Sequence, residues 1–261
     1  MTQVFAVEAM TERVTGAVRS AAARTGVDFS YLMAQARVES GLNPAARAQT
    51  SSASGLFQFT AATWLETVRK HGAEHGLGWA ADAIGSGVAG AGSAARATIL
   101  ALRDNADAAA LMAGEFAADN GAALAAKLQR AVGATDLYMA HFLGAGGATR
   151  FLKTLQNAPE TTAASLFPAA AAANRSVFYG RDGAARSVGD VYARFAAKLG
   201  AGGPLSPLAA SVSSRPLPQP EAPPSRQRER DGGAVPASGN ALPVAADRAR
   251  LAYLLLAELG A

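Results

Sequence analysis

Apolar residues recur at helical spacing through much of this chain. In the stretch 5–24, for example, Val14, Ala17, Val18 and Ala21 fall on one face of a helix. Alanine is abundant and loses no side-chain entropy in a helix, whereas aromatic residues make up only 7% of the sequence. No stretch alternates Val, Ile, Thr and aromatic residues with polar ones as a half-buried strand would. We therefore predict a mainly α fold.

The composition changes after residue 200. Seven of the twelve prolines lie between positions 204 and 224, separated by Ser, Gly and Arg. Such a segment is typical of a flexible or semi-extended linker. Four leucines then return at helical spacing near the end of the chain. We predict one domain over residues 1–200, a Pro-rich linker over 201–243 and a short amphipathic helix over 244–261.

This C-terminal helix has two interpretations. It either packs back on its own domain or lies on a flexible tether, where it can bind a groove on a protein partner. Leucine spacing alone does not separate the two. The length of the linker favours docking to a partner.

Small residues also predict breaks within the first domain. The Gly/Ala/Ser-rich stretch 80–95 is expected to be a surface loop. Helical patterns over 105–119 and 121–131 are expected to form two separate helices. A sharp bend is predicted at residues 144–147, which read Gly-Ala-Gly-Gly.

A single carboxylate, Glu39, lies at the end of an apolar helical run. Asp28 is the expected N-cap of this helix, and Gly41 and Pro44 are expected to end it. A carboxylate in the last turn meets the negative end of the helix dipole, and apolar neighbours also disfavour its charge. A carboxyl that keeps its proton near neutral pH suits a general acid. Position alone favours an ordinary solvated side chain.

The neighbouring residues change that interpretation. The sequence reads Glu39-Ser40, then Asn43-Pro44, then Gly-Leu-Phe-Gln at 55–58. This composite pattern closely resembles the lytic transglycosylase family, where it is Glu-Ser, Asn-Pro and Gly-Leu-Met-Gln; Phe57 replaces the Met, one apolar side chain for another. The resemblance covers about residues 25–155. It implies a lysozyme-like catalytic domain, helical with a small β part.

The resemblance also implies a reaction. Glu39 would protonate the oxygen of the β-1,4 bond between N-acetylmuramic acid and N-acetylglucosamine in peptidoglycan. The ionised Glu39 would then take the proton of the muramic acid 6-hydroxyl, which closes a 1,6-anhydro ring. Such a reaction consumes no water and requires no metal or cofactor.

Other residues match the family pattern around the acid. Ser40 is expected to support the catalytic helix or to hydrogen-bond near the acid. Ser54, Gly55, Phe57 and Gln58 match a loop that holds the N-acetyl and hydroxyl groups of the sugars. Turn formation is the alternative role for Gly55, and internal hydrogen bonding is an equal alternative for Gln58.

A third family motif, Ala-Tyr-Asn-Ala-Gly, aligns with residues 140–144. Here His141 stands in place of the Tyr and Phe142 in place of the Asn. Tyr138, one helical turn earlier, and Tyr179 are candidates for the role of the missing Tyr. We predict that both tyrosines and His141 bind substrate. A lone histidine on a helix is more often structural than catalytic.

Further acidic residues leave a hydrolytic mechanism open. Glu115 lies among apolar residues and is a candidate second carboxylate opposite Glu39, although a surface position is the commoner outcome. Glu66 and Glu74 are weaker candidates for the same role. A second catalytic carboxylate would make the protein a muramidase that uses water.

Metal and thiol chemistry find little support in the sequence. The absence of cysteine excludes disulfides, thiolate catalysis and Cys-based zinc sites. His71, Glu74 and His75 are close in sequence but lack the spacing of a helical zinc pair, so no metal is predicted.

Charge and hydropathy bear on partners and location. The net charge is +4, but no Lys/Arg block indicates nucleic-acid binding, and a mild positive charge fits an anionic polymer only weakly. The N-terminus lacks the basic start and apolar core of a signal peptide, and no apolar run is long enough for a membrane span. A cell-wall substrate implies the periplasm or the wall, so we expect export by another route or a leader missing from the sequence.

Three functions remain open at this point. The favoured one is a lytic transglycosylase that remodels the wall locally, for example for a flagellar or secretion apparatus. The alternatives are a hydrolytic muramidase and a non-catalytic scaffold that binds the wall. The presence of Glu39 beside the complete Gly55–Gln58 pattern argues against the scaffold.

Overall fold

The computed structural model describes residues 2–49 and 51–200, so the predicted linker and C-terminal helix lie outside the described residues. The described part is mainly helical, as predicted. In chain order its elements are α1 (Thr2–Thr25), α2 (Phe29–Ser40), α3 (Ala61–His71), the 3-10 helix η1 (Gly72–His75), α4 (Gly78–Gly85), α5 (Ala94–Ala101), the 3-10 helix η2 (Leu102–Asp104), α6 (Ala106–Leu128), α7 (Ala134–Asn157), α8 (Ala163–Leu166), α9 (Pro168–Ala173), α10 (Arg175–Phe178) and α11 (Val188–Gly200).

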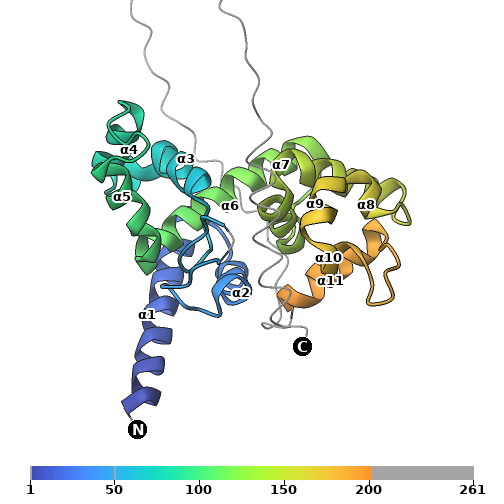
Figure 1. The fold of residues 1–261 in the computed structure, drawn as a ribbon, viewed down its shortest axis with the longest axis horizontal. Coiled ribbons are helices and arrows are strands. Elements are labelled where there is room, and N and C mark those ends of the chain that lie inside the picture. Colours follow the sequence, from blue (N-terminus) through green and yellow to red (C-terminus); the bar gives the residue numbers. More distant parts are fainter. Residues whose placement is uncertain (1, 50, 201–261) are drawn as a thin grey trace, which may run out of the picture.

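Helix α6 crosses the middle of the molecule (Figure 1). It packs against α1 and α3 toward the N-terminal helices and against α7 toward the C-terminal ones. Helix α11 returns to contact both α7 and α2. Helix α2 therefore lies where the two ends of the domain meet. No helix in the described ranges is long and apolar enough to cross a bilayer.

Helix α2 begins and ends where the sequence predicts. The Asp28 side chain accepts a hydrogen bond from the backbone N–H of Tyr31 at 2.9 Å, which satisfies a free donor of the first turn. Gly41 ends the helix in the left-handed conformation, with φ 61°, and its N–H donates to the carbonyl of Arg37. These caps fix Glu39 in the last turn.

The segment between α2 and α3 contains the small β part of the fold. Only isolated antiparallel bridges form in this described segment, between Arg47 and Ser54 and between Ser54 and Phe59. Thr60 then caps α3 by accepting a hydrogen bond from the N–H of Thr63 at 3.2 Å. The result is a tight loop held by few backbone pairs, which therefore depends on side chains for its shape.

One predicted break was partly right and one was wrong. Residues 78–85 form α4, because Ala80 is fully buried against the core, whereas residues 86–93 lie outside any helix, as expected for part of the predicted loop 80–95. Residues 106–128 form the single helix α6 instead of two helices. Burial of Asn120 and Leu124 on either side of Gly121 stabilises the helix across this glycine.

The predicted bend at residues 144–147 is confirmed. Gly144 has φ 74° and ψ 161° within α7, a conformation that breaks the helical path without ending the helix. The first half of α7 consequently packs toward α2, while the second half buries Phe151 and Leu152.

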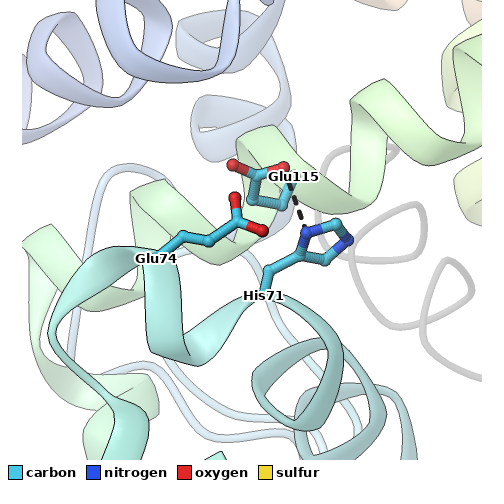
Figure 2. A group of neighbouring side chains, drawn as sticks. All are labelled: His71, Glu74 and Glu115. Atoms are coloured by element: carbon cyan, nitrogen blue, oxygen red, sulfur yellow. Dashed lines mark ion pairs between the residues drawn. The ribbon is translucent and has the colours of Figure 1, made fainter. Parts of the chain in front are cut away.

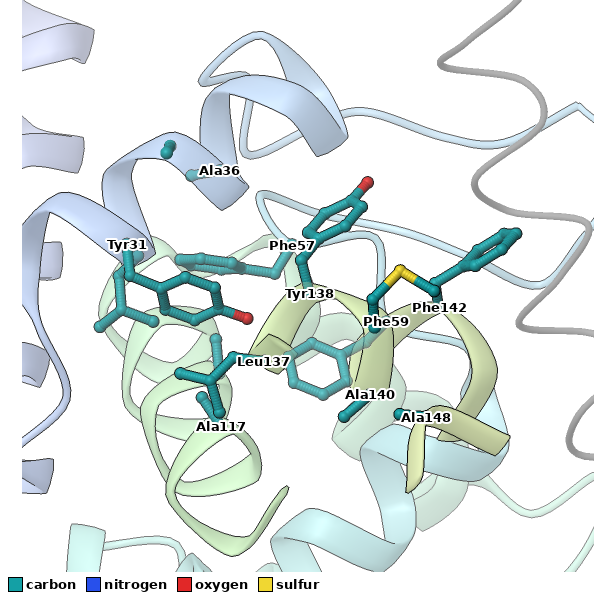
Figure 3. Packing of buried hydrophobic residues seen from close by; sticks show 14 of the residues in the cluster. Tyr31, Ala36, Phe57, Phe59, Ala117, Leu137, Tyr138, Ala140, Phe142 and Ala148 are labelled. Carbon is teal, nitrogen blue, oxygen red and sulfur yellow. The ribbon is translucent and has the colours of Figure 1, made fainter. Parts of the chain in front are cut away.

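Aromatic side chains from four parts of the chain meet beside α7. Figure 3 shows Tyr31 of α2, Phe57 and Phe59 of the loop, and Tyr138 and Phe142 of α7 in one layer. The ring of Phe195 on α11 lies 5.2 Å, between centroids, from those of both Tyr138 and Phe142. Pairs of this kind contribute about 0.5–1.5 kcal/mol beyond the burial of their area. This layer therefore fixes α2, α7 and α11 relative to one another.

Candidate active site

Glu39 is buried, with only 1% of its surface exposed, and two side chains of α7 face it. The hydroxyl of Tyr138 donates a hydrogen bond to Oε1 at 3.1 Å. Nε2 of His141, three residues later, also lies 3.1 Å from Oε1. The other oxygen, Oε2, is buried and has no hydrogen-bond partner among the described residues. One oxygen of the carboxyl is thus held by its neighbours, while the other keeps its hydrogen-bonding capacity.

Burial decides which groups around Glu39 remain protonated. It raises the pKa of Tyr138 well above the usual value near 10, and the negative charge of Glu39 raises it further. The pKa of Tyr31 rises for the same two reasons. Both phenols therefore keep their protons at neutral pH, which makes Tyr138 a hydrogen-bond donor to the carboxyl.

Lys198 of α11 supplies a positive charge to the same region. Burial lowers the pKa of Lys198, whereas the negative charge of Glu39 opposes that shift. Within residues 2–49 and 51–200, its Nζ is buried without a hydrogen-bond partner. The ammonium therefore interacts with the Glu39 carboxyl through its charge.

His141 lies between the buried carboxyl of Glu39 and the surface. Its side chain is 18% exposed, compared with 1% for that of Glu39. The ring packs edge-on against Phe116, with 6.4 Å between centroids, and lies 5.8 Å from the ring of Tyr138. This packing orients Nε2 toward Oε1, where an imidazole and a carboxyl can share one proton.

Ser40 connects α2 to the loop. Its hydroxyl donates to the carbonyl of Leu56 at 2.8 Å and also lies 3.1 Å from the carbonyl of Ala36. The contact anchors the loop next to Glu39.

Gly55 allows the loop to approach Arg103. Its φ is 82°, and a Cβ at this position would lie 1.9 Å from the backbone oxygen of Arg103. Its own N–H donates to the carbonyl of Ala46 at 2.9 Å. No other residue fits here, so the glycine has a clear structural function.

The other predicted loop residues bind mainly to the protein itself. The Gln58 amide donates to the carbonyls of Gly55 at 2.9 Å and Ala46 at 3.3 Å, which is the internal bonding considered for it. The Ser54 hydroxyl donates to Asp104 at 2.9 Å, and Arg47 pairs with the same carboxylate. Phe57 is 1% exposed and belongs to the aromatic layer.

Arg103 was not predicted from the sequence, although it organises this loop. Its guanidinium donates to the carbonyls of Ser52 at 2.5 Å and Phe59 at 3.0 Å. Burial lowers its pKa. No local signal could have identified this role, because the loop carbonyls that Arg103 binds lie more than 40 positions away in the sequence.

Tyr179 and Glu115 lie apart from this group of side chains. The Tyr179 ring packs under the guanidinium of Arg175, 4.8 Å from its centroid, and has no recorded contact with Glu39 in the described chain. Glu115 pairs with His75 at 2.6 Å and His71 at 3.4 Å, instead of facing Glu39. Of the two tyrosines proposed to replace the family's Tyr, Tyr138 is the one that contacts the acid.

Residues 16–82 match the family model described as Transglycosylase SLT domain. The matched segment includes α2 with Glu39, the loop through Gln58, and α3. The match confirms the predicted resemblance to lytic transglycosylases over this segment. It ends before α7, so Tyr138 and His141 are known here only from their geometry.

Proposed function

We propose that this protein is a peptidoglycan lytic transglycosylase with Glu39 as its catalytic residue. The proposal starts from the segment that matches a transglycosylase domain and contains this buried acid. One observation carries the proposal. Oε1 of Glu39 accepts a hydrogen bond from Tyr138 and lies 3.1 Å from Nε2 of His141, while Oε2 has no hydrogen-bond partner in the described part of the chain. A general acid needs this combination of a held carboxyl and a free oxygen that can reach the substrate.

The first step is proton donation. Protonated Glu39 gives its proton from Oε2 to the oxygen that joins N-acetylmuramic acid to N-acetylglucosamine. The bond between this oxygen and the anomeric carbon breaks, and N-acetylglucosamine leaves with a 4-hydroxyl group. Positive charge then develops at the anomeric carbon, and Glu39 is left as an anion.

The second step returns the proton. The Glu39 carboxylate accepts the proton of the muramic acid 6-hydroxyl, whose oxygen bonds to the anomeric carbon and closes the 1,6-anhydro ring. Glu39 is protonated again at the end, so the cycle balances without water. The same carboxyl acts first as the acid and then as the base.

The surroundings of Glu39 favour this reuse of one carboxyl. The hydrogen bond from Tyr138 and the charge of Lys198 both stabilise the carboxylate between the two steps. Hydrolytic glycosidases generally need two carboxylates. In the described part of the chain, the side chains that hydrogen-bond or pair with Glu39 are Tyr138 and His141, and neither is a carboxylate.

Access to the acid is part of the proposal. Because Glu39 is 1% exposed, a sugar can reach Oε2 only when neighbouring segments move. Movements of this kind commonly accompany substrate binding and exclude water from a site.

The proposal is tested by digestion of purified, insoluble peptidoglycan with the full chain. The wild-type protein should release soluble muropeptides, and Glu39→Gln should reduce the rate by about 10²–10⁴, the usual contribution of general acid catalysis. Glu66→Gln is the matched control, because Glu66 pairs with Arg69 on the exposed surface of α3. Equal rates for Glu39→Gln and wild type, with both folded by circular dichroism, would refute the proposal.

We further propose that the protein acts in the periplasm or cell wall and remodels the wall locally. The C-terminal helix predicted for residues 244–261 would then dock to an assembly partner. Deletion of residues 204–261 should preserve activity on isolated peptidoglycan and remove binding to that partner. Loss of activity in the truncated chain would instead place the helix in the catalytic domain.

A further inference from the structure

A second cluster of ligand-type side chains lies where α3 and η1 meet α6. His71 ends α3, Glu74 belongs to η1 and Glu115 comes from the middle of α6 (Figure 2). One donor atom from each lies within 4.8 Å of the others. Sequence spacing gave no sign of this cluster, because Glu115 is supplied from 40 residues farther along the chain.

The spacing of two of these atoms fits a bound metal better than a direct contact. Nδ1 of His71 lies 3.4 Å from Oε2 of Glu115. Charged hydrogen bonds of this type are usually about 2.7–2.9 Å long, so this one is not well formed. Two ligands at about 2.1 Å from a tetrahedral metal lie about 3.4 Å apart, which is the distance found here.

Outer groups hold both ligands in place. Nε2 of His71 lies 2.9 Å from Asp119, and donation of its proton there leaves the lone pair of Nδ1 directed into the cluster. The other oxygen of Glu115, Oε1, lies 2.6 Å from Nε2 of His75. A carboxylate behind a ligating histidine is the usual support of a metal ligand.

Charge also favours a cation in this place. Glu74, Glu115 and Asp119 bring three carboxylates, and Lys70 is the ammonium paired with them, through Asp119 at 2.7 Å. Arg24 reaches only the backbone carbonyl of Glu74, at 3.3 Å. The carboxylates outnumber this ammonium, which favours the binding of a divalent cation.

We propose that His71, Glu74 and Glu115 bind a divalent transition metal, with zinc as the best match to one imidazole and two carboxylates. Three protein ligands leave a fourth position for water. The site would clamp the α3–η1 turn to α6. This inference does not depend on the proposed function, because the cluster contains none of the residues that surround Glu39.

The test is titration of the purified, tag-free full chain with ZnCl₂ after removal of metal by a chelator. We expect one zinc per chain by calorimetry, and a rise in Tm because zinc binds the folded state. Cobalt(II) added in place of zinc should produce the visible absorption bands of a tetrahedral site. Absence of saturable binding at one equivalent would overturn the proposal.

Substitutions identify the ligands. Glu115→Gln, His71→Gln and Glu74→Gln should each weaken zinc binding at least tenfold. Glu74 is exposed, so misfolding would not explain the effect of its substitution. His141→Phe is the control, since the chain has only three histidines and His141 lies at the other site. Binding that is unchanged in Glu74→Gln and Glu115→Gln would show an adventitious ion and refute the assignment.

Discussion

The hydroxyl of Tyr138 lies 3.1 Å from Oε1 of Glu39, joining α7 to the last turn of α2 across 99 positions of sequence. This contact joins Glu39, the acid predicted from the first motif, to Tyr138, which lies just before the motif at residues 140–144. It also provides a donor that keeps its proton, because burial raises the pKa of the phenol. The predictions below begin with this pair.

Replacement of Tyr138 by Phe should lower the rate of peptidoglycan cleavage by about 10–100-fold, because a hydrogen bond to a charged group contributes about 1.5–3 kcal/mol. The ring would still pack against Phe195, so the protein should fold, with a Tm lowered by the loss of this hydrogen bond. Initial rates of muropeptide release measure the effect. Tyr179→Phe is the matched control and should retain the wild-type rate; equal losses in both variants would contradict the role of Tyr138.

His141→Phe should also reduce activity, chiefly through kcat. The new ring can keep the contact with Phe116, but the nitrogen that faces Glu39 is lost. His141→Gln should recover part of the activity, since an amide can still donate to Oε1. If both variants cleave peptidoglycan at the wild-type rate, the nitrogen of His141 has no role in the reaction and the side chain contributes only packing.

Gly55→Ala should destabilise the protein far more than Gly41→Ala. Both glycines have positive φ, at 82° and 61°, but only Gly55 has backbone atoms in the space of a Cβ. Gly41→Ala should therefore cost about 1–2 kcal/mol for the left-handed conformation alone. Urea unfolding of both variants compares them directly, and similar free energies of unfolding would contradict the close approach of Gly55 to Arg103.

Stability should fall as the pH rises from about 10 to 12. Burial, together with the charge of Asp136, raises the pKa of Tyr192 to about 12. The neutral phenol therefore contributes its full stabilisation of the folded state below about pH 10, and this stabilisation is lost as the phenol ionises in the folded protein. The Tyr192 hydroxyl donates to Asp136 at 3.0 Å. Tyr192→Phe should lower the Tm at neutral pH and make the alkaline decline shallower. Tyr31 and Tyr138, whose pKa values are also raised, should preserve a residual slope.

Much of the fold could be predicted from local patterns, and so could the position of Glu39 in the last turn of α2. The caps of α2 at Asp28 and Gly41 follow from rules that involve neighbouring residues only, and the structure confirms both. The bend at Gly144 was likewise predictable, because a run of glycines rarely continues a straight helix. Gly121 misled the same reasoning, because the burial of its neighbours Asn120 and Leu124 keeps α6 continuous through the glycine.

The contacts of the site were harder to predict because they join distant segments. Tyr138 and Tyr179 were equivalent by sequence, and only the packing of α7 on α2 distinguishes them. Lys198 and Arg103 lie far from the motif in the sequence. Both are partly buried in the fold, and a sequence pattern does not reveal that burial. Glu115 was expected opposite Glu39 or on the surface, but its partners are His71 and His75.

The most direct test of the central claim, that Glu39 serves as both acid and base, is the mass of the products. Purified peptidoglycan should be digested with the full chain in water enriched in the heavy oxygen isotope, and the muropeptides weighed by mass spectrometry. Our account predicts 1,6-anhydro-muramic ends, lighter than hydrolytic ends by one water and free of the isotope. Reducing ends that carry the isotope would contradict it and identify a hydrolytic muramidase.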